Sequence, residues 1–157
     1  MSNGIITLIR RPEIIARLRR EPEFSIKTVE ELLRYESPVQ FLHQRTAVAD
    51  IDIAEVTIPK GSPLILMLGC ANRDPSRFRD PDVFDPDRED NEHLGFGTGI
   101  HACFGAPLAR LEGQIAMSTL ARRLENPRLV VEPPVYRKNP MVRGPQELRV
   151  AFDRVNP

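Results

Sequence analysis

A single cysteine, Cys103, stands in a glycine-rich segment, Phe96 to Gly105, directly in front of a long helical pattern. The first backbone N–H groups of a helix have no intrahelical partner, and the helix dipole favours negative charge beside them. A cysteine at this place therefore favours its thiolate form, which can bind a soft metal ion. Gly97 and Gly99 permit positive φ angles and a close approach of the backbone to a flat or bulky group. The segment thus predicts a thiolate that binds a large ligand.

The identity of that ligand depends on what surrounds the cysteine. No second cysteine or histidine stands at zinc-finger spacing from Cys103, which disfavours zinc. A single thiolate with His101 nearby fits haem iron better. A lone cysteine is more often a small buried apolar residue, and this is our interpretation of Cys70, which follows a predicted strand.

The elements that must position this segment are mainly helical. Apolar spacing and proline positions predict helices over Gly4–Arg10 and Pro12–Arg20, and a third that ends before Ser37-Pro38. Short strands are predicted between Gln40 and Leu68 and again from Arg128 to Val150, with a proline- and aspartate-rich coil before the cysteine segment. The fold class is therefore α+β, mainly α, with small antiparallel sheets and a single domain over residues 1–157.

Two sets of apolar residues carry further expectations. In the coil, three side chains need burial: Phe78, Val83 and Phe84. In the long helix over Pro107–Glu125, one apolar stripe is expected to face the core: Leu108, Leu111, Ile115, Leu120 and Leu124.

Composition excludes several classes of function. The chain has 22 basic and 22 acidic residues, so charge gives no reason to expect a nucleic acid or a membrane surface as partner. The longest nearly apolar run, Pro63 to Ala71, is far shorter than the ~20 residues of a membrane-spanning helix, and the N-terminus does not read as a secretory signal. Two cysteines form no disulfide scaffold, which predicts a reducing, cytoplasmic setting.

Three motifs in this order resemble the cytochrome P-450 family of bacterial type. They are Phe96-x-x-Gly99-x-x-x-Cys103-x-Gly105, Glu31-Leu32-Leu33-Arg34 and Phe84-Asp85-Pro86-Asp87-Arg88. The resemblance begins near Gly4 and covers only the C-terminal part of the family, like a short, truncated homologue. It implies the family's proximal lobe, in which a cysteine loop precedes a long helix.

The resemblance also implies roles for individual residues. Cys103 is expected to ligate the iron of haem b, with Phe96, Gly97 and Gly99 beside it and His101 and Arg45 at the haem propionates. His43 is expected to share that contact or to lie on the surface. Glu31, Arg34 and Arg88 are expected to form a buried charge network, and Val39, Phe41 and Leu42 to face the substrate.

The implied function is a haem-thiolate monooxygenase that oxidises an apolar small molecule with O₂ and electrons from a ferredoxin or flavoprotein. The family's oxygen-activating half has no counterpart in this sequence, so two alternatives stay open: a non-catalytic homologue that is a haem-binding or structural partner module, and a chain that folds without haem. If the chain folds alone, one apolar surface is expected to be exposed and to favour a homo-oligomer or a partner that supplies the missing half. Its residues are Ile5, Ile6, Leu8, Ile9, Val39, Phe41 and Leu42.

Overall fold

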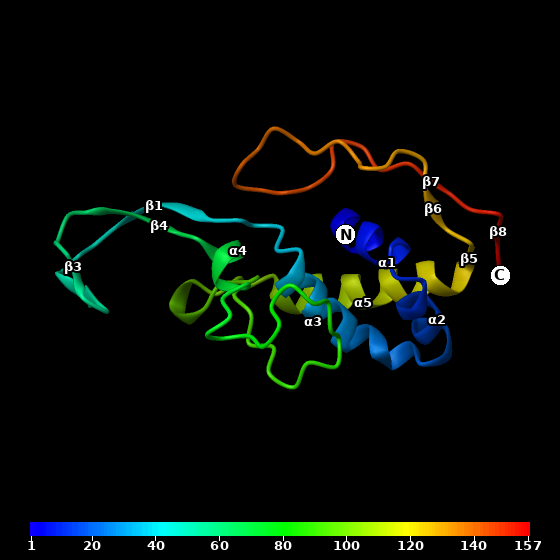
Figure 1. Ribbon diagram of the computed structural model, residues 1–157, viewed down its shortest axis with the longest axis horizontal. Helices are drawn as coiled ribbons and strands as arrows, with labels where there is room; N and C mark the ends of the chain where they lie inside the picture. The colour runs from blue at the N-terminus through cyan, green and yellow to red at the C-terminus, as the bar shows by residue number, and fades with distance from the viewer.

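The computed structural model describes all 157 residues and is mainly helical, with small antiparallel ladders. Figure 1 shows helices α1, α2, α3 and α5 gathered in one body, with strands β1 to β4 extending from it as an arm. The elements in chain order are α1 (Ser2–Ile9), α2 (Pro12–Arg20), the 3₁₀ turn η1 (Pro22–Phe24), α3 (Ser25–Tyr35), β1 (Leu42–Thr46), β2 (Ile51–Ile53), β3 (Val56–Ile58), β4 (Pro63–Leu66), α4 (Leu68–Ala71), η2 (Gly99–His101), α5 (Ala106–Arg123), β5 (Leu124–Glu125), β6 (Arg128–Leu129), β7 (Val150–Ala151) and β8 (Arg154–Val155).

The helix boundaries follow local chemistry. Pro12 opens α2, where its missing N–H removes no helical hydrogen bond. Helix α3 ends at Tyr35, two residues before Ser37, whose position in front of Pro38 disfavours helical angles. All three N-terminal helices lie where the sequence predicted them.

The core lies between α1, α2, α3 and α5, and one side chain of the coil closes it. Its buried members are Leu8, Ile15, Leu18, Phe24, Val29, Leu32, Phe84, Met117 and Ala121. Helices α3 and α5 come close because α5 carries a glycine at their contact: a Cβ atom on Gly113 would lie 3.2 Å from Cγ1 of Val29. That close approach fixes the helix that follows Cys103 against the helix that carries Glu31 and Arg34.

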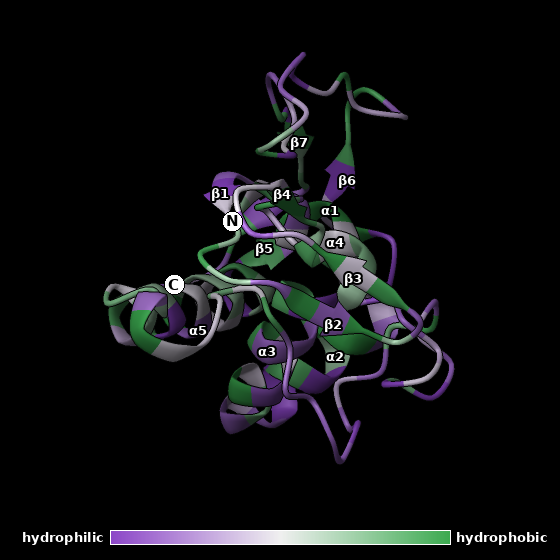
Figure 2. Cartoon of the chain, turned by 90° about the vertical axis from the view of Figure 1, so that its left-hand side faces the viewer, coloured by the Kyte–Doolittle hydropathy of each residue, from purple (hydrophilic) through white to green (hydrophobic).

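The predicted apolar stripe of α5 is wrong for three of its five residues, whereas Leu120 and Leu124 are half-buried. Leu108, Leu111 and Ile115 are 61%, 53% and 58% exposed, whereas Met117 and Ala121 are buried. A helix turns by about 100° per residue, so the first three side chains lie on one side and Leu120 on the other. The small side of α5 faces α3 because it permits close packing, and Figure 2 shows hydrophobic positions on the outward side of α5.

The expected exposure of α1 is also wrong. Ile6 and Leu8 are buried, and Ile5 and Ile9 are half-buried, because α1 packs on α2 and α3. The substrate-facing candidates Val39, Phe41 and Leu42 are likewise half-buried rather than exposed. The surface that the sequence predicted for association is therefore largely covered within this chain.

The strands form four two-stranded antiparallel ladders, β1–β4, β2–β3, β5–β8 and β6–β7, where we expected two small sheets. The two C-terminal ladders are too short to leave a hydrophobic pattern in the sequence. In the arm, β1 pairs with β4 through an irregularity between Leu42 and Arg45, and Gln44 there has a φ of 60°. His43 lies within this irregularity, and Arg45 directly follows it.

The coil between α4 and η2 contains no helix or strand, as the sequence predicted. Phe78 and Phe84 are buried beneath it. Val83 is 56% exposed, so the prediction of its burial is wrong. The backbone carbonyl of Val83 instead accepts a hydrogen bond from Arg34, which turns the side chain outward.

Candidate functional site: the Cys103 loop

The backbone of the Cys103 loop requires its glycines. Gly97 and Gly99 have φ angles of 68° and 67°, in the left-handed region that side chains disfavour. The N–H of Gly97 donates to the carbonyl of Leu94 at 2.9 Å, and that of Cys103 donates to the carbonyl of Phe96 at 2.9 Å. The loop is thus closed on itself, with Phe96 at one end and Cys103 at the other.

Cys103 lies at the surface, just before the first turn of α5. Its carbonyl accepts the N–H of Ala106 at 3.1 Å, and its sulfur is free and exposed. The N–H groups of Phe104 and Gly105 donate to no backbone acceptor. The thiol therefore stands where a helix start presents unpaired donors and favours negative charge.

Large apolar side chains flank the cysteine on the surface. Phe104 is 100% exposed and Ile100 is 97% exposed. Side chains of this size are normally covered, and two of them beside a free thiol mark a surface that fits an apolar ligand.

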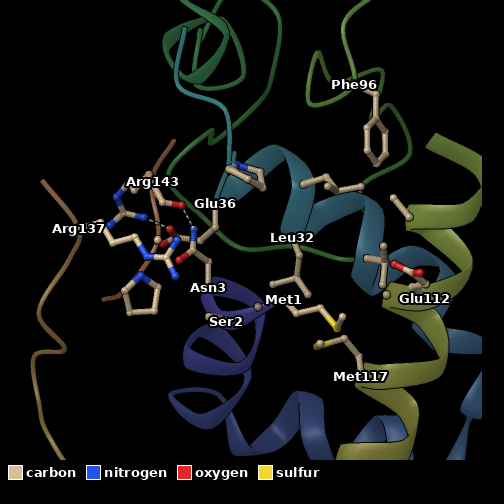
Figure 3. Close-up of a pocket in the computed structure, with 18 residues that line it drawn as sticks. Met1, Ser2, Asn3, Leu32, Glu36, Phe96, Glu112, Met117, Arg137 and Arg143 are labelled. Carbon is tan, nitrogen blue, oxygen red and sulfur yellow. Dashed lines mark hydrogen bonds and ion pairs between the residues drawn. The ribbon is translucent and has the colours of Figure 1, made fainter. Parts of the chain in front are cut away.

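A cavity of about 400 Å³ lies beside the loop, between α1, α3, α5 and the C-terminal coil. Phe96 and Ala109, which stand on the two sides of Cys103 in the chain, both line it. Figure 3 shows Leu32 and Met117 on its apolar floor, with Arg143 and Glu36 paired on the opposite wall.

Below the loop, Glu31 and Arg34 form a fully buried ion pair. Both side chains are 0% exposed, with Arg34 Nη2 2.8 Å from Glu31 Oε1. Arg34 Nη1 also donates to the carbonyls of Asn72 at 2.8 Å and Pro81 at 2.9 Å. Arg88 Nε lies 3.6 Å from Glu31 Oε2. The structure thus brings Glu31, Arg34 and Arg88 together and ties the coil to α3.

Asn72 extends this network to the loop. Its side chain is completely buried; it donates to Ser37 Oγ at 2.7 Å and accepts the N–H of Leu94 at 2.7 Å. Leu94 lies two residues before Phe96, so the buried network reaches the start of the cysteine loop.

The candidate propionate contacts lie on the surface. The side chain of Arg45 forms no ion pair, and its single hydrogen bond is a long one of 3.5 Å to the carbonyl of Gln44. His101 is exposed in η2, and His43 is exposed with its ring 6.4 Å from that of Phe41. No hydrogen bond or ion pair joins Arg45 or His43 to the loop.

Val39 is placed differently from the other substrate-side candidates. It forms an isolated antiparallel bridge with Val142, which links the segment before β1 to the C-terminal coil. The structure therefore puts Val39 close to the cavity, whereas Phe41 and Leu42 lead into the arm.

Sequence reasoning missed a second charged cluster, Glu30, His93 and Arg110. Glu30 Oε1 accepts from Arg110 Nε at 2.7 Å, and its Oε2 lies 3.2 Å from His93 Nε2. Burial alone would raise the pKa of Glu30, but the hydrogen bonds from His93 and Arg110 outweigh it and lower that pKa from 4.5 to about 2. Glu30 and Arg34 stand four positions apart on α3 but form no pair, because Arg34 bonds to Glu31. The signal in the sequence was that His93 and Arg110 flank the cysteine motif.

Cys70 is exposed in α4, so our interpretation of it as a buried residue is wrong. The sequence before it is apolar, but α4 is a short helix in which only Leu68 is buried.

Comparisons with known proteins identify the family of the chain. The family model for cytochrome P-450 matches residues 1–152. This chain belongs to the cytochrome P-450 family. A biotin biosynthesis cytochrome P-450 of Bacillus subtilis (strain 168) is 47% identical over 98% of this chain and 38% of its own length. The cytochrome P-450 monooxygenase PikC of Streptomyces venezuelae is 41% identical over 98% of this chain, again 38% of its own length.

Solved structures confirm the family's fold. The crystal structure of P450BioI in complex with an acyl carrier protein ligated to hexadec-9Z-enoic acid superposes with a TM-score of 0.90 at 48% identity. The match covers 97% of this chain and 39% of that one. This chain therefore spans about two fifths of the length of the P-450 proteins it matches. No helix in it combines the length and apolar character needed to cross a membrane.

The residues present fit the haem that the P-450 family implies. A free thiol stands on a glycine-shaped loop, and exposed apolar side chains flank it. Arg45 is a cation without a carboxylate partner, which suits an acidic group of a ligand.

Proposed function

We propose that this chain forms the haem-thiolate site of a P-450 monooxygenase, with Cys103 as the ligand of the iron of haem b. The observation that carries the proposal is the exposed Cys103 thiol on a loop shaped by Gly97 and Gly99 at the start of α5. The membership of the chain in the P-450 family supports it.

The proposed reaction inserts one atom of O₂ into a C–H bond of an apolar small molecule and releases the other as water. Two electrons from a ferredoxin or flavoprotein and two protons balance it. When bound, haem supplies the oxygen chemistry that side chains lack, and a thiolate ligand favours O–O cleavage. The relatives carry out different syntheses by name, including those of biotin and polyketides, so the proposal stays at the class of apolar small molecules.

Each remaining site residue has a proposed part. Phe96 packs beside the ligand, and His101 and Arg45 bind the haem propionates, with His43 as a further candidate. Val39, Phe41 and Leu42 face the substrate; the bridge of Val39 to the C-terminal coil supports this for the first of them.

A second candidate function is haem binding without oxidation. The exposure of Cys103, Phe104 and Ile100 favours it for this chain by itself, because oxygen activation requires a site from which water is excluded. Turnover of an apolar substrate by the 157-residue chain, coupled to the consumption of electrons, would contradict this second candidate.

The setting and the association of the chain are also proposals. Both cysteines are free, which suits a reducing compartment such as the cytoplasm. The apolar surface available to a second copy or a partner is the outward side of α5, not α1. Light scattering at micromolar concentration tests this: a homo-oligomer that Leu111→Glu converts to monomer would support the α5 surface, and an unchanged oligomer would contradict it.

The absorption spectrum of the reduced, carbon monoxide-treated protein tests the proposed function. We expect a red-shifted Soret band of the thiolate type in the haem-reconstituted chain, and its loss in Cys103→Ser. Cys70→Ser is the matched control, because it removes the other exposed thiol, and it should leave the band unchanged. Equal loss in both variants, or a normal band in Cys103→Ser, would contradict the assignment of Cys103.

A further inference from the structure

The cluster of Glu30, His93 and Arg110 touches both ends of the Cys103 loop. Glu30 lies on α3, His93 precedes the loop and Arg110 follows it in the second turn of α5. The carboxylate of Glu30 contacts Arg110 through both oxygens, at 2.7 Å and 3.0 Å, and contacts His93 through one of them. One side chain of α3 therefore bridges two segments that are separated in the chain by the whole cysteine motif.

The hydrogen bonds of His93 define its role in the cluster. Its side chain is 2% exposed. Nδ1 accepts the N–H of Gly95 at 3.0 Å, so Nε2 carries the proton of the neutral ring and donates to Glu30. The imidazole thus transmits the position of Glu30 to the backbone one residue before Phe96.

Gly95 shows how tightly this side of the loop is packed. A Cβ atom on Gly95 would lie 3.0 Å from His93 Nδ1 and 3.2 Å from the carbonyl oxygen of Leu33. The second contact is with helix backbone, which cannot move aside. The start of the loop therefore sits against α3 in one position.

Arg110 reaches the loop from the other side. Its guanidinium carbon lies 4.8 Å from the centre of the Phe96 ring, an arrangement typical of a cation–π contact. The carbonyl of Phe96 in turn accepts the N–H of Cys103. A continuous path of contacts leads from Glu30 through Arg110 and Phe96 to the backbone of Cys103.

We propose that Glu30 is a positioning residue that holds both ends of the Cys103 loop through His93 and Arg110 and thereby fixes Phe96 and the cysteine sulfur. This role is separate from that of Glu31, whose partners hold the coil. The fixation of the loop is a property of the haem-free chain; only its consequence at the iron rests on the proposed function.

Hydrogen exchange in the haem-free chain tests the fixation itself. We expect Glu30→Gln to speed exchange of the amides of Gly95 and Cys103 on the order of 10-fold, the effect of one lost charge-assisted hydrogen bond. Arg110→Gln should do the same, and combining the two should add little, because both break one unit. Arg110→Lys, which keeps the charge without the planar fork, should recover part of the protection.

The matched control is Glu147→Gln, which breaks the 2.7 Å ion pair of Glu147 with Arg149 in the C-terminal coil. It should leave exchange in the loop unchanged. Unchanged loop exchange in Glu30→Gln would overturn the proposal. An equal rise in the loop and throughout α2 would overturn it too, because Glu30 would then support the helical body rather than the loop.

The carbon monoxide spectrum separates this proposal from the proposed function. Faster loop exchange in Glu30→Gln, with no thiolate-type band even in the unchanged chain, would support the fixation and contradict the haem assignment. A thiolate-type band in the unchanged chain, with loop exchange unaffected by Glu30→Gln, would support the haem assignment and contradict the fixation. If both proposals hold, Glu30→Gln converts the thiolate-type band to a thiol- or histidine-type one more readily than Glu147→Gln does.

Discussion

The coil before the cysteine motif and the Cys103 loop are both irregular, but they are held in different ways. The coil is anchored from beneath by Glu31 and Arg34, which are completely buried and whose hydrogen bonds end on its backbone. The loop is held on both sides by Glu30, which is partly exposed, while Cys103 at its end is open to solvent. The coil, which supports the fold, is thus fixed by buried bonds to its backbone, whereas the loop proposed to bind a ligand is fixed from its two sides.

The largest effect should come from the anchor of the coil. Arg34→Ala leaves the carboxylate of Glu31 buried without its closest partner and leaves two backbone carbonyls without a donor. We expect a loss of ~3–5 kcal/mol in the free energy of unfolding, measured by urea denaturation. Arg149→Ala, which breaks an exposed pair, should cost less than about 1 kcal/mol. Similar losses in the two variants would show that burial does not distinguish the anchors.

The contribution of Glu30, which anchors the loop, to the free energy of unfolding should depend on pH in the acid range. The pKa of Glu30 is lowered from 4.5 to about 2, so its contribution to stability is complete above pH 4.5 and is lost as the pH falls towards 2. The Glu30 carboxylate is partly exposed, so solvent screening keeps its contribution well below the about 3 kcal/mol that the full shift would represent. Unfolding of the unchanged chain and of Glu30→Gln should be compared at several pH values, because other carboxylates titrate in the same range. We expect the difference in stability between the two proteins to shrink in acid, and a constant difference would contradict the role of Glu30.

The backbone of the loop should matter less for stability than for the ligand. Gly99→Ala forces a side chain into a φ of 67° and should cost about 1–2 kcal/mol. Gly61→Ala is the matched control, because Gly61 has a φ of 87° in the turn before β4 and should cost a similar amount. Only the change at Gly99 should weaken haem binding, measured by titration of the absorbance. Equal haem affinity in the two variants would show that the loop shape is not needed.

The smallest effect is expected on the outward side of α5, next to the loop. Leu111 is half exposed, so Leu111→Ala should change the free energy of unfolding by less than about 0.5 kcal/mol. Met117→Ala on the buried side of the same helix should cost ~2–5 kcal/mol. Comparable costs would mean that the outward side is covered in solution, and a concentration-dependent cost for Leu111→Ala would identify a second copy as the cover.

The sequence predicted the family, the helices and the motifs because these depend on local spacing. Cys103, the two glycines with positive φ and the pair of Glu31 with Arg34 were all visible within short segments. The orientation of α5 was not, because small residues such as Gly113 decide which side of a helix comes closest to its neighbour. The spacing of the leucines alone does not show which side of α5 approaches α3 most closely.

The cluster of Glu30, His93 and Arg110 was missed for a different reason. Its partners are separated by 63 and 80 positions in the chain. A residue of opposite charge, Arg34, also stands four positions from Glu30 on the same helix. Burial of Arg34 with Glu31 removes that partner and leaves Glu30 for the loop. Competition of this kind between neighbouring carboxylates is resolved only by tertiary packing.

Arg143 forms one wall of the cavity, and its contacts determine when this wall can close during synthesis of the chain. The carbonyl of Arg143 accepts a hydrogen bond from the side chain of Asn3, and its guanidinium pairs with Glu36. These two residues precede Arg143 by 140 and 107 positions in the chain. Its N–H also donates to the carbonyl of Pro38. A ribosome releases residues in chain order, so the loop of Cys103 and the helix behind it emerge before this wall can close. The nascent chain therefore passes through a stage in which the cavity is still open on the side that Arg143 later closes.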